Sequence, residues 1–222
     1  MDENVTAILP AYNEEENIKD TINAVKGIEG ITEIIVVDDG SEDNTYRAAE
    51  GFKDILLIHN NANKGKGGAI KAALPYVSNK YVIFIDADLK QSASEMKKLV
   101  SNTKRNSRTM LVAVYPKPLK KGGFGLVKCL SRKGLYMLTS KTSDSVLSGQ
   151  RLVSTEFIRN ISIPSNFAME FKITLEAIKN GLNIVEVPVN IRHRETGRNI
   201  KGFIHRGKQF VNILNVLIRE MM

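Results

Sequence analysis

The stretch Tyr81-Val-Ile-Phe-Ile-Asp86-Ala-Asp88-Leu89 is an apolar run that ends in two carboxylates. Its β-branched and aromatic residues predict a buried strand, and because strand side chains alternate between faces, Asp86 and Asp88 are expected to point the same way. Open α/β folds bind their ligands at the carboxyl ends of their strands. This stretch therefore predicts both an α/β fold and the place of its site.

The two acids require a cation, because adjacent carboxylates repel each other. We expect Mg²⁺ or Mn²⁺ at Asp86 and Asp88, since both ions favour carboxylate oxygens and commonly share their coordination shell with substrate phosphates. The alternative is an exposed turn in which Asp88 caps the helix that follows.

The rest of the chain repeats this pattern of an apolar run, a turn and a helix. Four such units in the first half, each with a strand apolar throughout, predict a mostly parallel central sheet with helices on both faces. Pro188 marks the last strand as an edge. Candidate strands cover residues 5–9, 33–37, 55–58, 81–86, 110–114, 148–153 and 184–189, and candidate helices in the second half cover residues 124–138, 168–180 and 210–218.

Composition indicates an ordinary globular chain of 222 residues, long enough for a full core. No apolar run approaches the ~20 residues that span a bilayer, and the first residues are acidic where a signal peptide would be basic. We therefore expect a cytoplasmic protein, at the inner face of the membrane if its acceptor is a lipid. Cys129 is the only cysteine, which excludes an intramolecular disulfide and a zinc cluster.

Charge is distributed unevenly. Of the net charge of +8, the segment from Met96 to Ser143 supplies twelve Lys or Arg and no acid, so the remainder sums to −4. This divides the chain into an acidic, metal-binding half at 1–95 and a basic half at 96–222 that suits an anionic partner. We expect no nucleic acid, because stacking aromatics do not accompany the basic residues. The helix at 124–138 is either a solvated cover for the core or a helix lying on an anionic membrane.

Two glycine-containing stretches carry lysines or arginines. Asn63-Lys-Gly-Lys-Gly-Gly68 matches neither the Walker loop nor G-x-G-x-x-G, which argues against an NTPase and a classical dehydrogenase. It is either a phosphate cradle using Lys64, Lys66 and helix amides or a simple tight turn. Residues 192–208 contain six Lys or Arg among seventeen residues. We expect this second stretch, as a loop through Lys208, to close over phosphates, with a solvated basic loop as the alternative.

Five motifs together resemble the family 2 nucleotide-sugar glycosyltransferases of GT-A fold. The resemblance implies a single GT-A domain over residues 1–222 and a UDP- or GDP-sugar donor. The motifs, in chain order, are Pro10-Ala-Tyr12-Asn13-Glu14, Val37-Asp38-Asp39-Gly40-Ser41, Asn63-Lys-Gly-Lys-Gly, Asp86-Ala-Asp88-Leu89 and Glu186-Val-Pro188.

The resemblance also implies roles for individual residues. Asp86 and Asp88 would hold the metal, Asp88 would take part in catalysis, and Glu170 stands where many members have an acid near the acceptor. The nucleotide would be contacted by Pro10, Tyr12, Glu14, Asp38, Asp39, Lys64, Gly65, Asp86 and Ala87, and the diphosphate or acceptor by Arg151, Arg194, Arg198 and Lys201.

The acceptor side fits the resemblance less closely. Small members of this kind, the dolichyl- and polyprenyl-phosphate sugar transferases, usually have Gln where Lys90 stands and Arg near Val114. His193 is more similar to the late histidine that completes the metal site in glucosyl-3-phosphoglycerate synthases. The acceptor is therefore left as a polyprenyl phosphate or a small phosphorylated metabolite.

Alternatives to sugar transfer are a sugar nucleotidyltransferase and a non-catalytic sugar- or membrane-binding module of the same fold. The first would show a Gly-rich signature with Arg and Lys after the first strand, where this chain is acidic. Both aspartates being present argues against the second. A homodimer and a peripheral contact with the membrane are left open.

Overall fold

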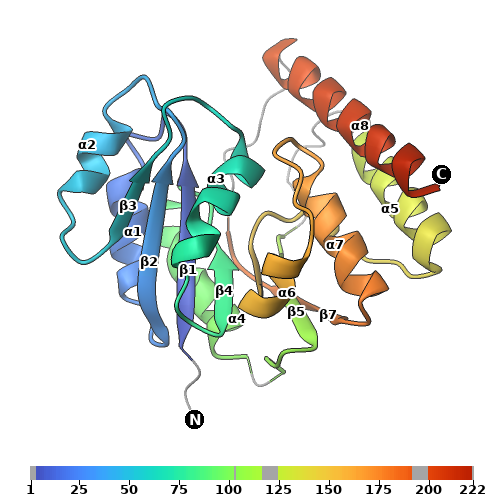
Figure 1. Ribbon diagram of the computed structural model, residues 1–222, viewed down its shortest axis with the longest axis horizontal. Coiled ribbons are helices and arrows are strands. Elements are labelled where there is room, and N and C mark those ends of the chain that lie inside the picture. The colour runs from blue at the N-terminus through green and yellow to red at the C-terminus, as the bar shows by residue number, and fades with distance from the viewer. Residues whose placement is uncertain (1–3, 103, 117–124, 192–199, 222) are drawn as a thin grey trace.

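The computed structural model describes residues 4–102, 104–116, 125–191 and 200–221 of the chain. Its centre is a seven-stranded sheet in the order β3-β2-β1-β4-β6-β5-β7 (Figure 1). β6 is antiparallel to both of its neighbours, and the other strand pairs are parallel. The strands are β1 (Val5–Ala11), β2 (Ile31–Asp38), β3 (Leu56–His59), β4 (Tyr81–Phe84), β5 (Thr109–Val114), β6 (Arg151–Ser154) and β7 (Asn183–Pro188).

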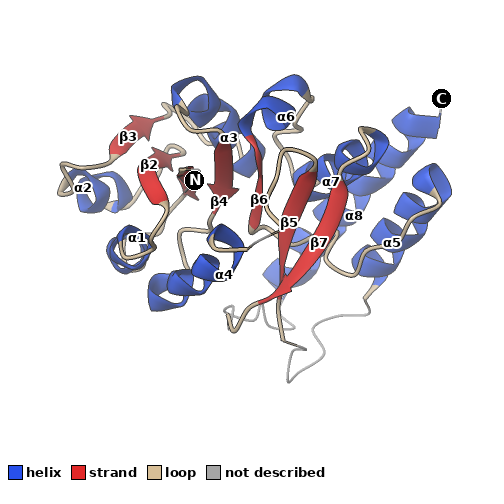
Figure 2. Cartoon of the chain, turned by 90° about the horizontal axis from the view of Figure 1, so that it is seen from below, coloured by secondary structure: helices blue, strands red, loops and turns tan. Residues whose placement is uncertain are grey.

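Helices cover both faces of this sheet (Figure 2). Alternation along β1 sends Val5 and Leu9 into the core on one face and Ile8 into the core on the other. The first face is covered by α1 (Ile18–Lys26), η2 (Lys90–Met96) and α4 (Lys97–Val100), and α2 (Thr45–Glu50) packs beside α1. The second is covered by α3 (Lys66–Ala73), η1 (Leu74–Tyr76), α6 (Thr155–Asn160) and α7 (Met169–Lys179).

An outer layer is added by α5 (Leu126–Thr139) and α8 (Ile200–Met221), which lie side by side against α7 (Figure 1). Their shared core includes Leu135 from α5, Phe171 from α7 and Ile213 from α8, all fully buried. Among the described residues, no helix combines the length and the apolar character that crossing a membrane requires.

Most of the predicted elements are confirmed, including the parallel strands of the first half and β7 as an edge strand. The glycine stretch opens α3, as predicted. The final helix, predicted over 210–218, begins ten residues earlier, so residues 200–208 are helical and do not form a loop. The predicted loop was wrong because Gly202 and Gly207 were taken to interrupt the helix. A glycine inside a helix costs only about 1 kcal/mol relative to alanine, so the helix can continue through both.

Two glycines fix the start of α3 against the segment that leads into α7. A Cβ added at Gly67 would lie 1.9 Å from the carbonyl oxygen of Pro164, and one at Gly65 would lie 2.4 Å from that of Ser165. Gly65 also has a φ of +76°, which side chains rarely adopt. Backbone contact at this point therefore needs glycine on the α3 side.

Gly67→Ala should lower the free energy of unfolding by about 1–3 kcal/mol, because overpacking against a backbone carbonyl cannot be relieved by a side-chain rotation. Urea unfolding followed by circular dichroism measures this change. The matched control is Gly207→Ala, which is also in a helix but has open space around the new methyl group. The control should be neutral or stabilising by up to ~1 kcal/mol. Equal effects of the two substitutions would contradict the packing argument.

Candidate functional site

The carboxyl ends of β1, β2 and β4 meet at one edge of the sheet, around a cavity of about 440 Å³. Its wall contains most of the nucleotide-binding residues predicted from the sequence, together with Lys66 and Phe167. The predicted residues that line it are Pro10, Tyr12, Glu14, Asp39, Gly65, Asp86, Ala87 and Asp88.

Four carboxylates line this cavity, those of Glu14, Asp39, Asp86 and Asp88, and give it a negative field. Asp86 is 27% exposed, and Asp88 is exposed. Glu14 faces both from the loop after β1, and the pKa of its carboxyl is raised by burial and by the charges of Asp88, Asp43 and Asp86, against a lowering hydrogen bond from Asn17. The cavity therefore favours a bound cation.

Lys66 is the cation that the chain itself supplies. Its Nζ pairs with Asp86 Oδ1 and lies 3.5 Å from Glu170 Oε1. Burial alone would lower the pKa of Lys66, but the charges of Asp86 and Glu170 outweigh burial, so the pKa is raised and the ammonium persists. A Cβ at Gly149 would lie 2.5 Å from Lys66 Nζ and 2.9 Å from Asp86 Oδ2, so this pair needs a glycine beside it.

The turn after the acid pair is fixed by Thr21 of α1, a residue that the sequence analysis did not identify. The buried Thr21 hydroxyl donates to the carbonyl of Ala87 at 2.7 Å and accepts from the amide of Lys90 at 2.8 Å. Lys90 has a φ of +50°. Thr21 lies 66 residues from Ala87, so the sequence gives no direct sign that it fixes this turn. The one available signal was a polar residue on the apolar face of α1.

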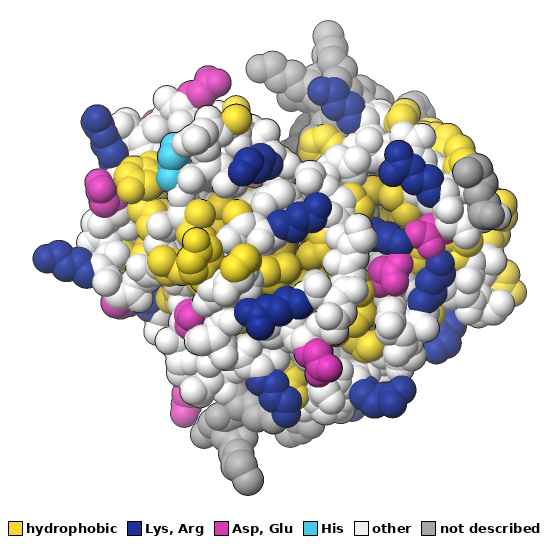
Figure 3. Space-filling model, viewed as in Figure 1, with side chains coloured by type: hydrophobic (Ala, Val, Ile, Leu, Met, Phe, Trp, Pro, Cys, Tyr) yellow, Lys and Arg dark blue, Asp and Glu magenta, His cyan; other side chains and the backbone are white. Residues whose placement is uncertain are grey.

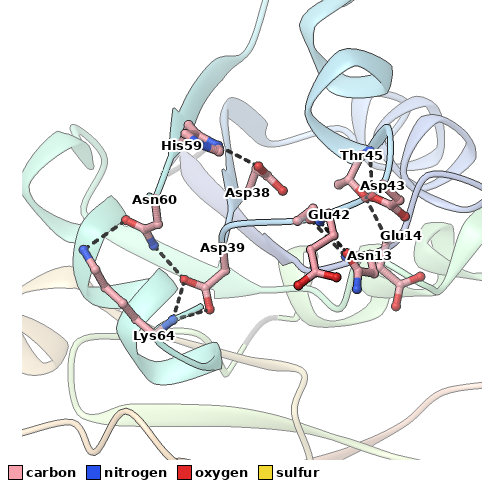
Figure 4. Close-up of polar contacts among 11 residues, drawn as sticks. Asn13, Glu14, Asp38, Asp39, Glu42, Asp43, Thr45, His59, Asn60 and Lys64 are labelled. Atoms are coloured by element: carbon pink, nitrogen blue, oxygen red, sulfur yellow. Dashed lines mark hydrogen bonds and ion pairs between the residues drawn. The ribbon is translucent and has the colours of Figure 1, made fainter. Parts of the chain in front are cut away.

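The loops that follow β1 and β2 interlock (Figure 4). The amide of Asn13 donates to Ser41 Oγ at 3.0 Å, and the amide of Glu42 donates to Asn13 Oδ1 at 2.9 Å. The amide of Glu14 donates to Thr45 Oγ1 at 2.7 Å. These exchanged bonds hold the Glu14 backbone in place beside the acid pair.

Asp38, the last residue of β2, and Asp39, which follows it, have different surroundings (Figure 4). Asp39 accepts from the amide of Lys64 with both oxygens, at 3.1 and 3.0 Å, and from Asn60 Nδ2 at 2.8 Å, so it anchors the glycine stretch. Asp38 is buried and its Oδ2 lies 2.7 Å from His59 Nδ1. The expected nucleoside contacts of both aspartates, and of Lys64, stay predictions.

Arg151, expected at the diphosphate or acceptor, is fully buried behind the cavity wall. Its guanidinium donates to the carbonyls of Glu170, at 3.0 Å, and Ser148, and to Thr174 Oγ1 at 3.2 Å. Burial lowers its pKa to about 10, with the charges of Glu170 and Asp86 acting in the opposite direction. Arg151 therefore braces the backbone of Glu170, and its contact with a ligand stays a prediction.

A second cavity, of about 580 Å³, lies between the end of β5, α5 and residues 144–148. Lys128, Arg132 and Asp144 line its wall, and because Arg132 pairs with Asp144 at 2.9 Å, Lys128 leaves this wall with a net positive charge. Ser148 lines this cavity, whereas the adjacent Gly149 touches Lys66 and Asp86 of the first cavity. The two cavities therefore adjoin at Ser148-Gly149.

Glu186, on β7, fixes the segment that lines the second cavity. Its Oε1 accepts from the hydroxyl of Ser143 at 2.7 Å, from the amides of Asp144 at 2.9 Å and Ser145 at 3.1 Å, and from the hydroxyl of Ser145 at 2.6 Å. Burial would raise the pKa of Glu186, but these donors outweigh it and lower the pKa. Glu186 was identified from the sequence only as part of a motif. Its structural role could not be predicted, because its hydrogen-bond partners lie more than forty residues away.

Asp86 and Asp88 supply the oxygen donors that Mg²⁺ and Mn²⁺ favour. In the part of the chain that the structure describes, no three His, Cys, Asp or Glu side chains could hold a metal by themselves. Such ions commonly complete their coordination shell with oxygens from a substrate phosphate. The predicted ligand His193 and the predicted phosphate contacts Arg194 and Arg198 lie outside the described residues, as does the side chain of Lys201.

Comparison with known proteins agrees with this geometry. The model of glycosyl transferase family 2 matches residues 6–149, and the chain belongs to that family. It is 26% identical to the dolichol-phosphate mannosyltransferase of Pyrococcus furiosus, over 89% of this chain and 59% of that protein. It is 29% identical to the UDP-N-acetylglucosamine–dolichyl-phosphate N-acetylglucosaminyltransferase of Methanococcus voltae, over 87% and 88%.

Among solved structures, glucosyl-3-phosphoglycerate synthase from Mycobacterium tuberculosis, in complex with Mn²⁺, UDP and glucosyl-3-phosphoglycerate, superimposes with a TM-score of 0.79. The likeness covers 98% of this chain and 80% of that one at 22% identity. It confirms the predicted GT-A fold, and the family confirms that the chain is a glycosyltransferase.

Lys66 should react with an acylating reagent at pH 8 at least ~10-fold more slowly than the exposed Lys64, because a raised pKa keeps the amine protonated and unreactive. Peptide mass spectrometry over a time course measures both rates in one sample. Asp86→Asn should speed the acylation of Lys66 and leave that of Lys64 unchanged. Equal rates at Lys66 and Lys64 in the unsubstituted protein would refute the ion pair.

Proposed function

We propose that this protein is a metal-dependent glycosyltransferase that moves a sugar from a UDP- or GDP-sugar to a phosphorylated acceptor. The observation that carries this proposal is the juxtaposition of two cavities, one with the acid pair and Lys66 and the other with Lys128 and Arg132. A donor in the first cavity and an acceptor in the second would meet at Ser148-Gly149.

The donor half acts through charge. Breaking the bond from sugar to diphosphate leaves negative charge on the departing phosphate, and stabilising that charge is the main task of such a site. Asp86 and Asp88 would hold Mg²⁺ or Mn²⁺, which would neutralise part of that charge. Lys66, kept protonated by Asp86 and Glu170, would supply a second positive charge on the same side.

Glu170 has a role that depends on the acceptor. A hydroxyl acceptor needs a base, and Glu170 is the acid of α7 nearest to Lys66 at the cavity junction. A phosphate acceptor is already ionised at neutral pH and needs none. With a phosphate acceptor, the Glu170 carboxylate would hold Lys66 in place and would take no part in proton transfer.

Two findings in relatives support this reading. The two curated relatives are named for transfer to dolichyl phosphate, and two solved structures of the Mycobacterium tuberculosis synthase contain Mn²⁺, one with UDP and one with UDP-glucose. The test is a mass-spectrometric screen of the purified protein with UDP-glucose, UDP-N-acetylglucosamine and GDP-mannose, each against short polyprenyl phosphates and against 3-phosphoglycerate. Metal-dependent product with one pair supports the proposal, and a product that contains nucleoside monophosphate would instead identify a nucleotidyltransferase.

Asp88→Ala should weaken the binding of nucleoside diphosphate in Mn²⁺ by at least ~10-fold, because the carboxylate would link the nucleotide to the protein through the metal. Isothermal titration with UDP and GDP, in Mn²⁺ and in EDTA, measures the loss. Glu29→Ala, an exposed acid in the loop before β2, is the control and should bind as the unsubstituted protein does. Equal affinity in the two buffers would refute a metal role for Asp88.

Lys128→Glu should raise the acceptor KM by about 10-fold or more and leave the affinity for nucleotide nearly unchanged, because Lys128 lines only the second cavity. Steady-state kinetics with the acceptor found in the screen, and UDP titration of the same preparation, separate the two effects. Lys104→Glu, also basic and exposed, is the control. Loss of nucleotide binding in Lys128→Glu would show that the division into donor and acceptor cavities is wrong.

A further inference from the structure

The outer layer exposes large apolar side chains on two neighbouring helices. On α5, Leu126, Tyr136 and Met137 are 61%, 57% and 67% exposed. On α8, exposed apolar residues recur at helical spacing and alternate along the sequence with the buried Ile213 and Leu217. They are Val211, Leu214, Ile218 and Met221.

Some residues of both rows lie beside the contact between the helices. A Cβ at Gly134 of α5 would lie 2.4 Å from the Leu217 side chain of α8. The backbone of α5 therefore packs directly against the Leu217 side chain at that point. Met137 follows Gly134 by one turn, and Leu214 and Ile218 flank Leu217. Figure 3 shows hydrophobic side chains along the right-hand rim, where Figure 1 places α5 and α8. We call these residues, with Cys129 and Lys133, the α5–α8 face.

Positive charge accompanies this face. Residues 126–139 contain Lys128, Arg132 and Lys133 and no acid. Lys133 lies at helical spacing between Leu126 and Met137, and its side chain is exposed. The acid of α8, Glu220, is already neutralised by ion pairs with Lys172 and Lys179.

We propose that the α5–α8 face rests on the surface of a bilayer that contains anionic lipids. Apolar side chains would enter the boundary between head groups and acyl chains, while Lys133 extends its ammonium group to the lipid phosphates. A second copy of this chain fits less well, because a self-complementary contact would bring Lys133 against the partner's cations without an acid to balance them.

The placement gives the proposed function a lipid-linked acceptor, and this consequence alone rests on that function. Lys128 and Arg132 line the second cavity from the same helix that carries Leu126 and Met137. A phosphate head group at the bilayer surface would therefore lie within one helix diameter of the second cavity. Binding of the bare protein to vesicles needs neither nucleotide nor acceptor, so the surface can be tested separately.

The test uses Cys129, which is exposed on α5 and is the only cysteine of the chain. An NBD fluorophore at Cys129 should become brighter, and its emission should shift to shorter wavelength, when vesicles are added. The vesicles are phosphatidylcholine with roughly 30% phosphatidylglycerol, which gives them about a physiological surface charge. Lipids with doxyl-labelled chains should quench it. The control is Cys129→Ser with Glu50→Cys, which moves the label to α2 at the opposite end of the molecule. Its label should stay unchanged.

Three variants test the chemistry of the contact by vesicle co-sedimentation. Met137→Gln with Ile218→Gln should weaken vesicle affinity by about 10-fold or more, and Tyr76→Gln, which removes an exposed apolar residue elsewhere, should not. Lys133→Gln should weaken binding to anionic vesicles by about 5-fold. UDP affinity should be unaffected in all three.

Two outcomes would overturn the proposal. The first is an unchanged Cys129 label with vesicles that contain anionic lipid. The second is a concentration-dependent dimer in analytical ultracentrifugation that Met137→Gln with Ile218→Gln abolishes, which would identify the face as a contact between two copies. If the unsubstituted protein binds vesicles but does not bind UDP, the proposed function is refuted and the assignment of the α5–α8 face to a bilayer surface stands.

Discussion

The ion pair between Lys66 and Asp86 joins the parts of the chain that form the site. Lys66 is the first residue of α3, Asp86 follows β4, and Glu170 reaches the same ammonium from α7. Gly149 gives the pair room, and the contacts of Gly65 and Gly67 with Pro164 and Ser165 hold α3 beside α7. These segments are far apart in the sequence, so the site exists only once the whole sheet has formed.

Lys66 also explains how two carboxylates can stand together in the absence of a ligand. The sequence suggested a metal because it showed two acids and no obvious counter-ion. The fold supplies Lys66 as a counter-ion for Asp86, and Asp88 lies exposed in the wall of the same cavity. Metal and lysine need not compete under the proposed function, since the Asp86 carboxylate has two oxygens and could pair with Lys66 while it binds an ion together with Asp88.

The structural features that could be predicted from the sequence are those that depend on a local pattern of residues. The apolar run before Asp86, the acids after β2 and the glycines before α3 each fix a strand end or a helix start, and the structure places all three where they were predicted. Long-range hydrogen bonds could not be read in this way. Thr21 and Glu186 act on residues 66 and more than 40 positions away, and the burial of Arg151 could not be read from a single arginine in the sequence. The start of α8 was missed because two glycines outweighed a helical pattern in the prediction.

The reversed direction of β6 has a consequence for how this fold can change. Because β6 is antiparallel, Arg151 at its start lies beside Phe84 at the end of β4, and the chain that enters β6 faces the site. Everything between β5 and β6, including α5 and the segment held by Glu186, is therefore a single excursion that leaves from the site edge and returns to it. Such an excursion can lengthen, shorten or be exchanged without altering the register of any parallel strand. If this segment lines the acceptor cavity, as the proposed function has it, a graft of residues 115–149 from a relative would be a route to changing the acceptor and keeping the donor.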